Sequence, residues 1–114
     1  MKRIIAGLLT TATIMASCIS VSANELVFYH GNDDSAKKCF AATTQTEDEN
    51  IGARITWQLS DENTVEYGPY NTSNGYQVTS YSRRLAGKSG WSYGYYYNNG
   101  TIVHRSTEWY GFNF

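Results

Sequence analysis

Apolar and polar residues alternate with a period of two along much of the chain after residue 24. The clearest case is the segment 53–59, in which Ile55, Trp57 and Leu59 alternate with polar neighbours. Successive side chains of a strand point to opposite faces, so this pattern predicts a half-buried β-strand. Further strands are expected over 25–30, 64–68 and 76–85, and on both sides of residues 99–100.

Turn-forming residues separate these segments at 60–63, 69–75 and 86–90. Short strands divided by turns in this way indicate an all-β fold, either a small antiparallel β-sandwich or a barrel. One segment departs from the pattern. Over residues 33–42 we expect one or two helical turns, with Asp33 or Asp34 capping the start.

The most unusual segment is GWSYGYYYNNGTIVHR, residues 90–105. Its Asn99-Gly100 pair predicts a two-residue type I′ turn, because both central positions of that turn need a positive φ. The resulting register pairs Tyr97 with Ile102 and Tyr95 with His104. One face then carries Trp91, Tyr93, Tyr95, Tyr97, Ile102 and His104, and the other carries Ser92, Gly94, Tyr96, Asn98, Thr101, Val103 and Arg105.

The row of Trp91, Tyr93, Tyr95 and Tyr97 has two interpretations at this point. Aromatic side chains bury large areas, so the row suits the core of a small domain. Tyrosine hydroxyls need hydrogen-bond partners when buried, however, and three in a row on one face also suit a surface that stacks on sugars or lipid head groups. A split between the two, with Trp91 inside, is a third arrangement.

The N-terminus has the three parts of a secretory signal peptide: two basic residues at 2–3, an uncharged apolar run, and small residues before Asn24. The apolar run is too short to span a bilayer comfortably, so no transmembrane segment is expected in the mature chain. These features predict a secreted protein with a signal peptide over 1–23 and a single β-rich domain over 24–114. The alternative is a lipoprotein anchored through Cys18, because MASC at 15–18 resembles a lipoprotein box.

Charge is distributed unevenly over residues 24–114. Nine of the ten acidic residues lie before residue 67, where three basic residues oppose them. Beyond it, Arg83, Arg84, Lys88 and Arg105 face only Glu108. Residues 24–114 thus carry a net charge of −3, which disfavours nucleic acid as a partner. The four basic residues either form a contact surface for a partner or neutralise the charge of the acidic half within the fold.

No group of residues predicts catalysis, a metal or a cofactor. His30 precedes Asp33 and Asp34, but no second histidine stands at ligand spacing, and the stretch equally suits a polar turn. Cys39 has no partner in residues 24–114 and is either a buried thiol or a handle for an intermolecular disulfide. A non-enzymatic protein is therefore expected.

Four short segments resemble the small secreted bacteriocins of the lactococcin 972 family. They are EYG at 66–68, SYS at 80–82, AGKSGWSYG at 86–94 and WYGFNF at 109–114. The resemblance is confined to the C-terminal half; the family's His-rich middle is absent, and the acidic N-terminal region has no counterpart. It implies a cysteine-poor β-sandwich that binds a cell-wall precursor and blocks septum formation.

Two hypotheses follow for the function. The first is a secreted, non-enzymatic antibacterial or cell-envelope-binding protein, in which aromatic rings contact sugars and basic side chains contact pyrophosphate. Its binding residues would be Trp91, Tyr93, Tyr95, Tyr97, Arg83, Arg84, Lys88 and Arg105. The second is a secreted structural or inhibitory protein that binds another exported protein through a Tyr-rich strand surface.

Overall fold

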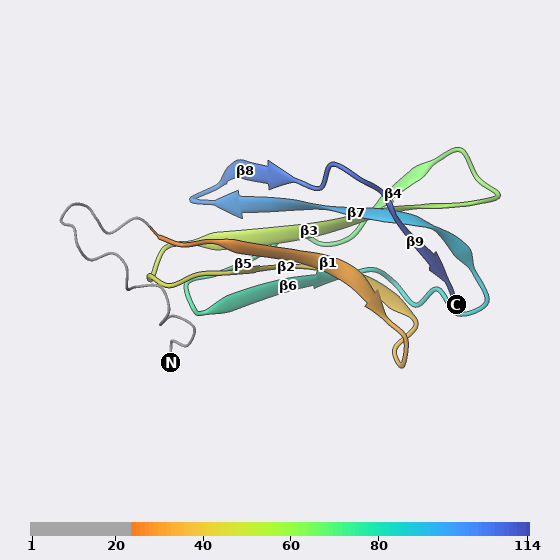
Figure 1. The fold of residues 1–114 in the computed structure, drawn as a ribbon, viewed down its shortest axis with the longest axis horizontal. Helices are drawn as coiled ribbons and strands as arrows, with labels where there is room; N and C mark the ends of the chain where they lie inside the picture. The colour runs from red at the N-terminus through yellow and green to blue at the C-terminus, as the bar shows by residue number, and fades with distance from the viewer. Residues whose placement is uncertain (1–23) are drawn as a thin grey trace.

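The computed structural model describes residues 24–114, so the expected signal peptide, its cleavage site and Cys18 lie outside the described residues. Within this range the protein is all-β, as the alternating pattern predicts, and its strands form two antiparallel sheets (Figure 1). The strands are β1 (Val27–Asp33), β2 (Lys38–Thr44), β3 (Ile51–Leu59), β4 (Val65–Tyr67), β5 (Asn71–Ser73), β6 (Gln77–Tyr81), β7 (Ser89–Asn98), β8 (Thr101–Arg105) and β9 (Tyr110–Asn113).

The two sheets pack face to face as a β-sandwich. The first sheet has the order β1-β2-β6. The second, which we call sheet B, has the order β4-β3-β7-β8, with β5 also pairing β3 and β9 also pairing β7. Figure 1 shows the layer of β1, β2 and β6 beneath that of β3, β7 and β8. The two long strands β3 and β7 therefore form the centre of sheet B.

The space between the sheets holds the larger of two hydrophobic clusters. Ile55, Trp57 and Leu59 on β3 all point into it, which confirms the predicted face of that strand. They meet Cys39 and Ala41 from β2. Cys39 is fully buried as a free thiol, and burial raises its pKa to about 11. Of the two alternatives for this cysteine, the structure shows the buried thiol.

The helical turns expected over 33–42 are wrong. Residues 34–37 form a tight turn and β2 begins at Lys38. The Asp33 carboxylate accepts the Ala36 N–H at 3.1 Å and the Ser35 hydroxyl at 3.0 Å, and Lys37 has a φ of 59°. Aspartate therefore caps a β-turn here, because the same side-chain geometry serves turns and helix starts. Alternation in the following segment directs Cys39 and Ala41 into the core.

The turn at Asn99-Gly100 has the predicted conformation, with φ values of 53° and 80°. The predicted pairing of Tyr97 with Ile102 is also confirmed. Beyond it a β-bulge shifts the register, so Tyr95 pairs with Arg105 and the expected pairing of Tyr95 with His104 is wrong. One extra residue in β8 exchanges the faces of the residues that follow. Arg105 consequently joins the face of Tyr95.

The face of β7 that points into the sandwich carries Ser92, Gly94 and Tyr96. This is the face that the sequence predicts to be small and polar. The Tyr96 side chain lies along the strand over Gly94, where an added Cβ would be 2.5 Å from the Tyr96 hydroxyl oxygen. That hydroxyl donates to the Tyr29 carbonyl oxygen on β1 at 2.8 Å. A single tyrosine with a satisfied hydroxyl thus fills this side of the core.

Candidate functional site: the aromatic face of sheet B

The outward-facing side of sheet B carries most of the aromatic residues of its strands. Because directly opposed residues share a face, the register places Tyr95 between Arg54 on β3 and Arg105 on β8. Two further rings from outside these strands, Tyr70 and Trp109, pack onto this side. We call this surface the aromatic face; it consists of Tyr67, Tyr70, Trp91, Tyr93, Tyr95, Tyr97 and Trp109, together with Arg54 and Arg105.

The rings of the aromatic face are packed in a second layer outside the sandwich. The Trp109 ring centre lies 4.4 Å from that of Tyr93, which is only 6% exposed. Tyr70 contacts Tyr97 at 4.5 Å and lies over Gly52, where a Cβ would come within 2.8 Å of its ring. The lack of a side chain at residue 52 therefore makes room for Tyr70. This packing fixes the rings in position.

Other rings of the same surface are open to solvent. Trp91 is 46% exposed and Tyr67 is 54% exposed. The row of aromatic residues on β7 is therefore partly buried and partly exposed, but it is not the arrangement with Trp91 inside. Tyr93 is covered, Tyr95 and Tyr97 are half-buried, and Trp91 is presented to solvent.

Two guanidinium groups lie on tyrosine rings of this face. The Arg105 guanidinium carbon is 4.5 Å from the ring centre of Tyr93 and 5.7 Å from that of Tyr95. Arg54 lies 4.9 Å from the ring centre of Tyr67. Burial raises the pKa of Tyr93, so the phenol beside Arg105 stays neutral. The ion pair found within residues 24–114 joins Arg83 to Glu66, and neither Arg54 nor Arg105 has a carboxylate partner there.

The other basic residues expected at the site lie elsewhere. Arg83 and Arg84 follow β6, and Lys88 is exposed just before β7 begins. Arg83 binds Glu66 through two hydrogen bonds of 3.0 Å, which neutralise its charge. Arg84 donates to the Ala36 carbonyl oxygen at 3.4 Å. Of the four predicted basic residues, the structure brings only Arg105 to the aromatic row.

Arg54 belongs to the aromatic face but was absent from the sequence-based site. The alternation of β3 showed that its side chain points away from the core. What the sequence did not show is that β3 pairs with β7, so that Arg54 stands opposite Tyr95. The available signal was a basic residue on the solvent side of the strand predicted over 53–59.

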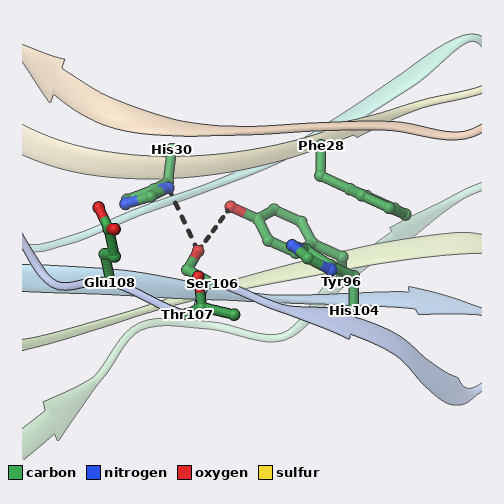
Figure 2. A pocket seen from close by; sticks show the side chains of 7 residues that line it. All are labelled: Phe28, His30, Tyr96, His104, Ser106, Thr107 and Glu108. Carbon is green, nitrogen blue, oxygen red and sulfur yellow. Dashed lines mark hydrogen bonds between the residues drawn. The ribbon is translucent and has the colours of Figure 1, made fainter.

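A pocket of about 200 Å³ opens at one edge of the sandwich, between β1 and β8 (Figure 2). Within it the Ser106 hydroxyl lies 3.2 Å from His30 Nδ1 and 3.3 Å from the Tyr96 hydroxyl, and accepts the Gly94 N–H at 3.0 Å. The residues lining the pocket are Phe28, His30, Tyr96, His104, Ser106, Thr107 and Glu108.

The polar contacts of this pocket join the two sheets. Burial, and then the proximity of His104, lower the pKa of His30, so its ring is neutral at neutral pH. A serine beside a histidine is one element of a nucleophilic pair. Here the Ser106 hydroxyl is buried and already accepts a backbone N–H, so we assign this network to holding β1 against sheet B. No cluster of three or more potential metal ligands occurs among residues 24–114.

The fold and the aromatic face together define a small antiparallel β-sandwich with a second aromatic layer on one sheet. Comparisons with models of protein families and with curated proteins find no match. The resemblance to the lactococcin 972 family therefore rests on the four short segments alone. Among residues 24–114 no helix is long and apolar enough to cross a membrane.

Proposed function

We propose that this is a secreted, non-enzymatic protein that binds a glycan component of a cell envelope through the aromatic face of sheet B. One observation carries the proposal: exposed rings of Tyr67, Trp91 and Trp109 stand on a single sheet face around a packed tyrosine row. Large exposed apolar groups gathered on one surface mark interaction sites. The C–H faces of sugar rings are natural partners for such aromatic groups.

The rigidity of the aromatic face supports binding of an extended ligand. Its central rings rest on backbone and on one another, so little side-chain freedom is lost when a ligand settles on them. Trp91, Tyr93, Tyr95 and Tyr97 follow every second position of β7, which spaces them by roughly 7 Å along the strand. A ligand of several sugar rings would contact more than one of them.

The experiment is retention of the purified protein on isolated bacterial cell walls. Tyr67→Ala should weaken retention about fivefold or more, since stacked rings contribute about 0.5–1.5 kcal/mol beyond their buried area. Tyr81→Ala is the matched control, because Tyr81 is also exposed but lies on β6 of the other sheet. Equal losses in both variants, or no retention of the wild type, would refute the proposal.

Antibacterial action is the more specific form of this proposal, and the four segments resembling the lactococcin 972 family support it. The aromatic face would then hold a wall precursor away from the enzymes that use it. Growth inhibition of a panel of bacteria by the wild type, lost in Tyr67→Ala and kept in Tyr81→Ala, is the expected result. Retention on walls without growth inhibition would leave an envelope-binding protein that is not a bacteriocin.

One observation favours the second function, binding to another exported protein. β8 is an edge strand of sheet B, and all five of its residues are exposed, including Ile102 and Val103. An exposed edge next to tyrosine-rich strands can accept a strand from a partner. Val103→Lys, which places a charge on this edge strand and keeps its backbone N–H, should weaken such pairing and leave wall retention intact.

A further inference from the structure

The aromatic face holds two positive charges that no residue of the described chain neutralises. Arg54 and Arg105 stand on either side of Tyr95, on the two strands that flank β7. From this we infer that the glycan bound there is acidic, a polyhydroxylated chain that carries repeated carboxylate or phosphate groups. This inference rests on the proposed function and adds the chemical class of the ligand and the two residues that recognise its charge.

The charge of the aromatic face differs from that of the rest of the domain. Residues 24–114 contain ten acidic and seven basic side chains. Yet no acidic residue shares the outward side of β3, β4, β7 and β8, where the polar positions hold Arg54, Thr56, Gln58 and Arg105. Arg83, by contrast, is paired with Glu66. An acidic protein that keeps two arginines unpaired on one surface is suited to bring an external anion to it.

Tyrosine rings hold both guanidinium groups in defined positions. Arg105 rests on Tyr93, and Arg54 rests on Tyr67 while its Nε donates to the Gly68 carbonyl oxygen at 3.0 Å. Arg105 also contacts the phenols of Tyr93 and Tyr95, and Arg54 contacts that of Tyr97. A guanidinium has five N–H donors, so further N–H groups of each arginine remain for a ligand. These groups bind a carboxylate or a phosphate through two parallel hydrogen bonds. The side chains are therefore ordered before a ligand arrives.

The separation of the two arginines indicates more than one anionic group. Their strands lie two inter-strand steps apart, roughly 10 Å. Arg54 also leans toward Tyr67 on β4 and Arg105 toward Tyr93 on β7, so their guanidinium groups do not converge on one point. A single phosphate or carboxylate would satisfy one arginine only. A chain with spaced charges would satisfy both while its sugar rings cover the tyrosines between them.

Calorimetric titration with defined ligands tests this inference. The probes are a hexamer of galacturonic acid, a neutral hexamer of β-linked glucose, galacturonic acid itself and an oligomer of glycerol phosphate. The acidic hexamer should bind about tenfold or more tightly than the neutral one, because charge-assisted hydrogen bonds are about twice as strong as neutral ones. Its affinity should fall with added salt, and galacturonic acid alone should bind much more weakly.

Variants separate charge from shape. Arg54→Gln and Arg105→Gln should each reduce affinity for the acidic hexamer about tenfold, since each removes one charge-assisted contact, and should leave the neutral hexamer within about twofold. Arg84→Gln, which replaces an exposed arginine outside the aromatic face, is the control and should change neither affinity. Arg105 is exposed, so its replacement tests the inference even where Arg54→Gln disturbs folding.

The possible results distinguish this inference from the proposed function. Equal binding of both hexamers, unchanged in the arginine variants, would overturn the acidic class and leave glycan binding in place. No binding of either hexamer, together with no retention on cell walls, would overturn both. If the glycerol phosphate oligomer bound as tightly as the galacturonic acid hexamer, contact between sugar rings and the tyrosines would not contribute to binding, and that part of the inference would be refuted. Equal losses in Arg84→Gln and Arg105→Gln would refute a specific contact.

Discussion

Replacing Gly94 by alanine tests how the core of the sandwich is built. A Cβ at residue 94 would lie 2.5 Å from the Tyr96 hydroxyl oxygen and 2.9 Å from the Ala41 Cβ. Both neighbours are buried, so either the Tyr96 ring or β2 has to move. Overpacking of this kind costs about 1–3 kcal/mol. A displaced Tyr96 also loses its hydrogen bond to the Tyr29 carbonyl oxygen, worth about 1 kcal/mol.

The expected loss in the free energy of unfolding is therefore about 2–4 kcal/mol. Urea unfolding followed by tryptophan fluorescence measures it, and Gly111→Ala is the control. At residue 111 the nearest atoms to an added Cβ are 3.9 Å away, so this substitution should be neutral or slightly stabilising. In a Tyr96→Leu background, Gly94→Ala should cost about 1 kcal/mol less than in the wild type. An unchanged midpoint for Gly94→Ala, or the same cost in both backgrounds, would refute the packing argument.

Three further predictions concern stability and reactivity. Because burial lowers the pKa of His30, this residue binds a proton in the unfolded chain at a higher pH than in the folded protein. The urea concentration at the unfolding midpoint should therefore decrease as the pH falls below about 6.5, and it should decrease less in His30→Gln. If the urea midpoint of His30→Gln fell with pH as steeply as that of the wild type, groups other than His30 would cause the loss of stability. Alkylation of Cys39 by iodoacetamide at pH 8 should be slow until urea unfolds the protein, because burial raises the thiol pKa to about 11. Rapid alkylation of the folded protein would contradict the buried position. Arg83→Ala should cost less than about 1 kcal/mol of stability, because its ion pair with Glu66 is at the surface. It should also leave cell-wall retention unchanged, and a large loss of retention would restore Arg83 to the binding site.

The two sides of β7 explain how aromatic residues serve both stability and binding. On the inner side Tyr96 fills the core above Gly94 and its hydroxyl meets a backbone carbonyl. On the outer side Tyr93 is buried under Trp109, which extends the packed region beyond the sandwich. A domain without a disulfide in residues 24–114 thus gains a second packed layer. The outermost rings of that layer are then available for contact with a ligand.

Local features of the sequence determined several parts of the fold. Alternation alone located β3 and its buried side, because the apolar residues at 55, 57 and 59 have only polar neighbours. Asn99-Gly100 fixed the hairpin turn, because few residue pairs accept a positive φ at both positions. The same local reasoning failed for residues 33–42, since an aspartate cap begins a turn as readily as a helix.

Long-range contacts decided which side of β7 is buried. Alternation divides a strand into two faces, but it does not say which face is inside when both carry aromatic rings. Across the sandwich the small side chain of Ala41 lies close to Gly94, in the same hydrophobic cluster as the ring of Tyr96. The bulge in β8 then moved Arg105 beside Tyr95, and pairing of β3 with β7 brought Arg54 to the other side. The sequence by itself thus determined the strands and their periodicity. The composition of the candidate site arose only from the pairing of strands that are distant in the chain.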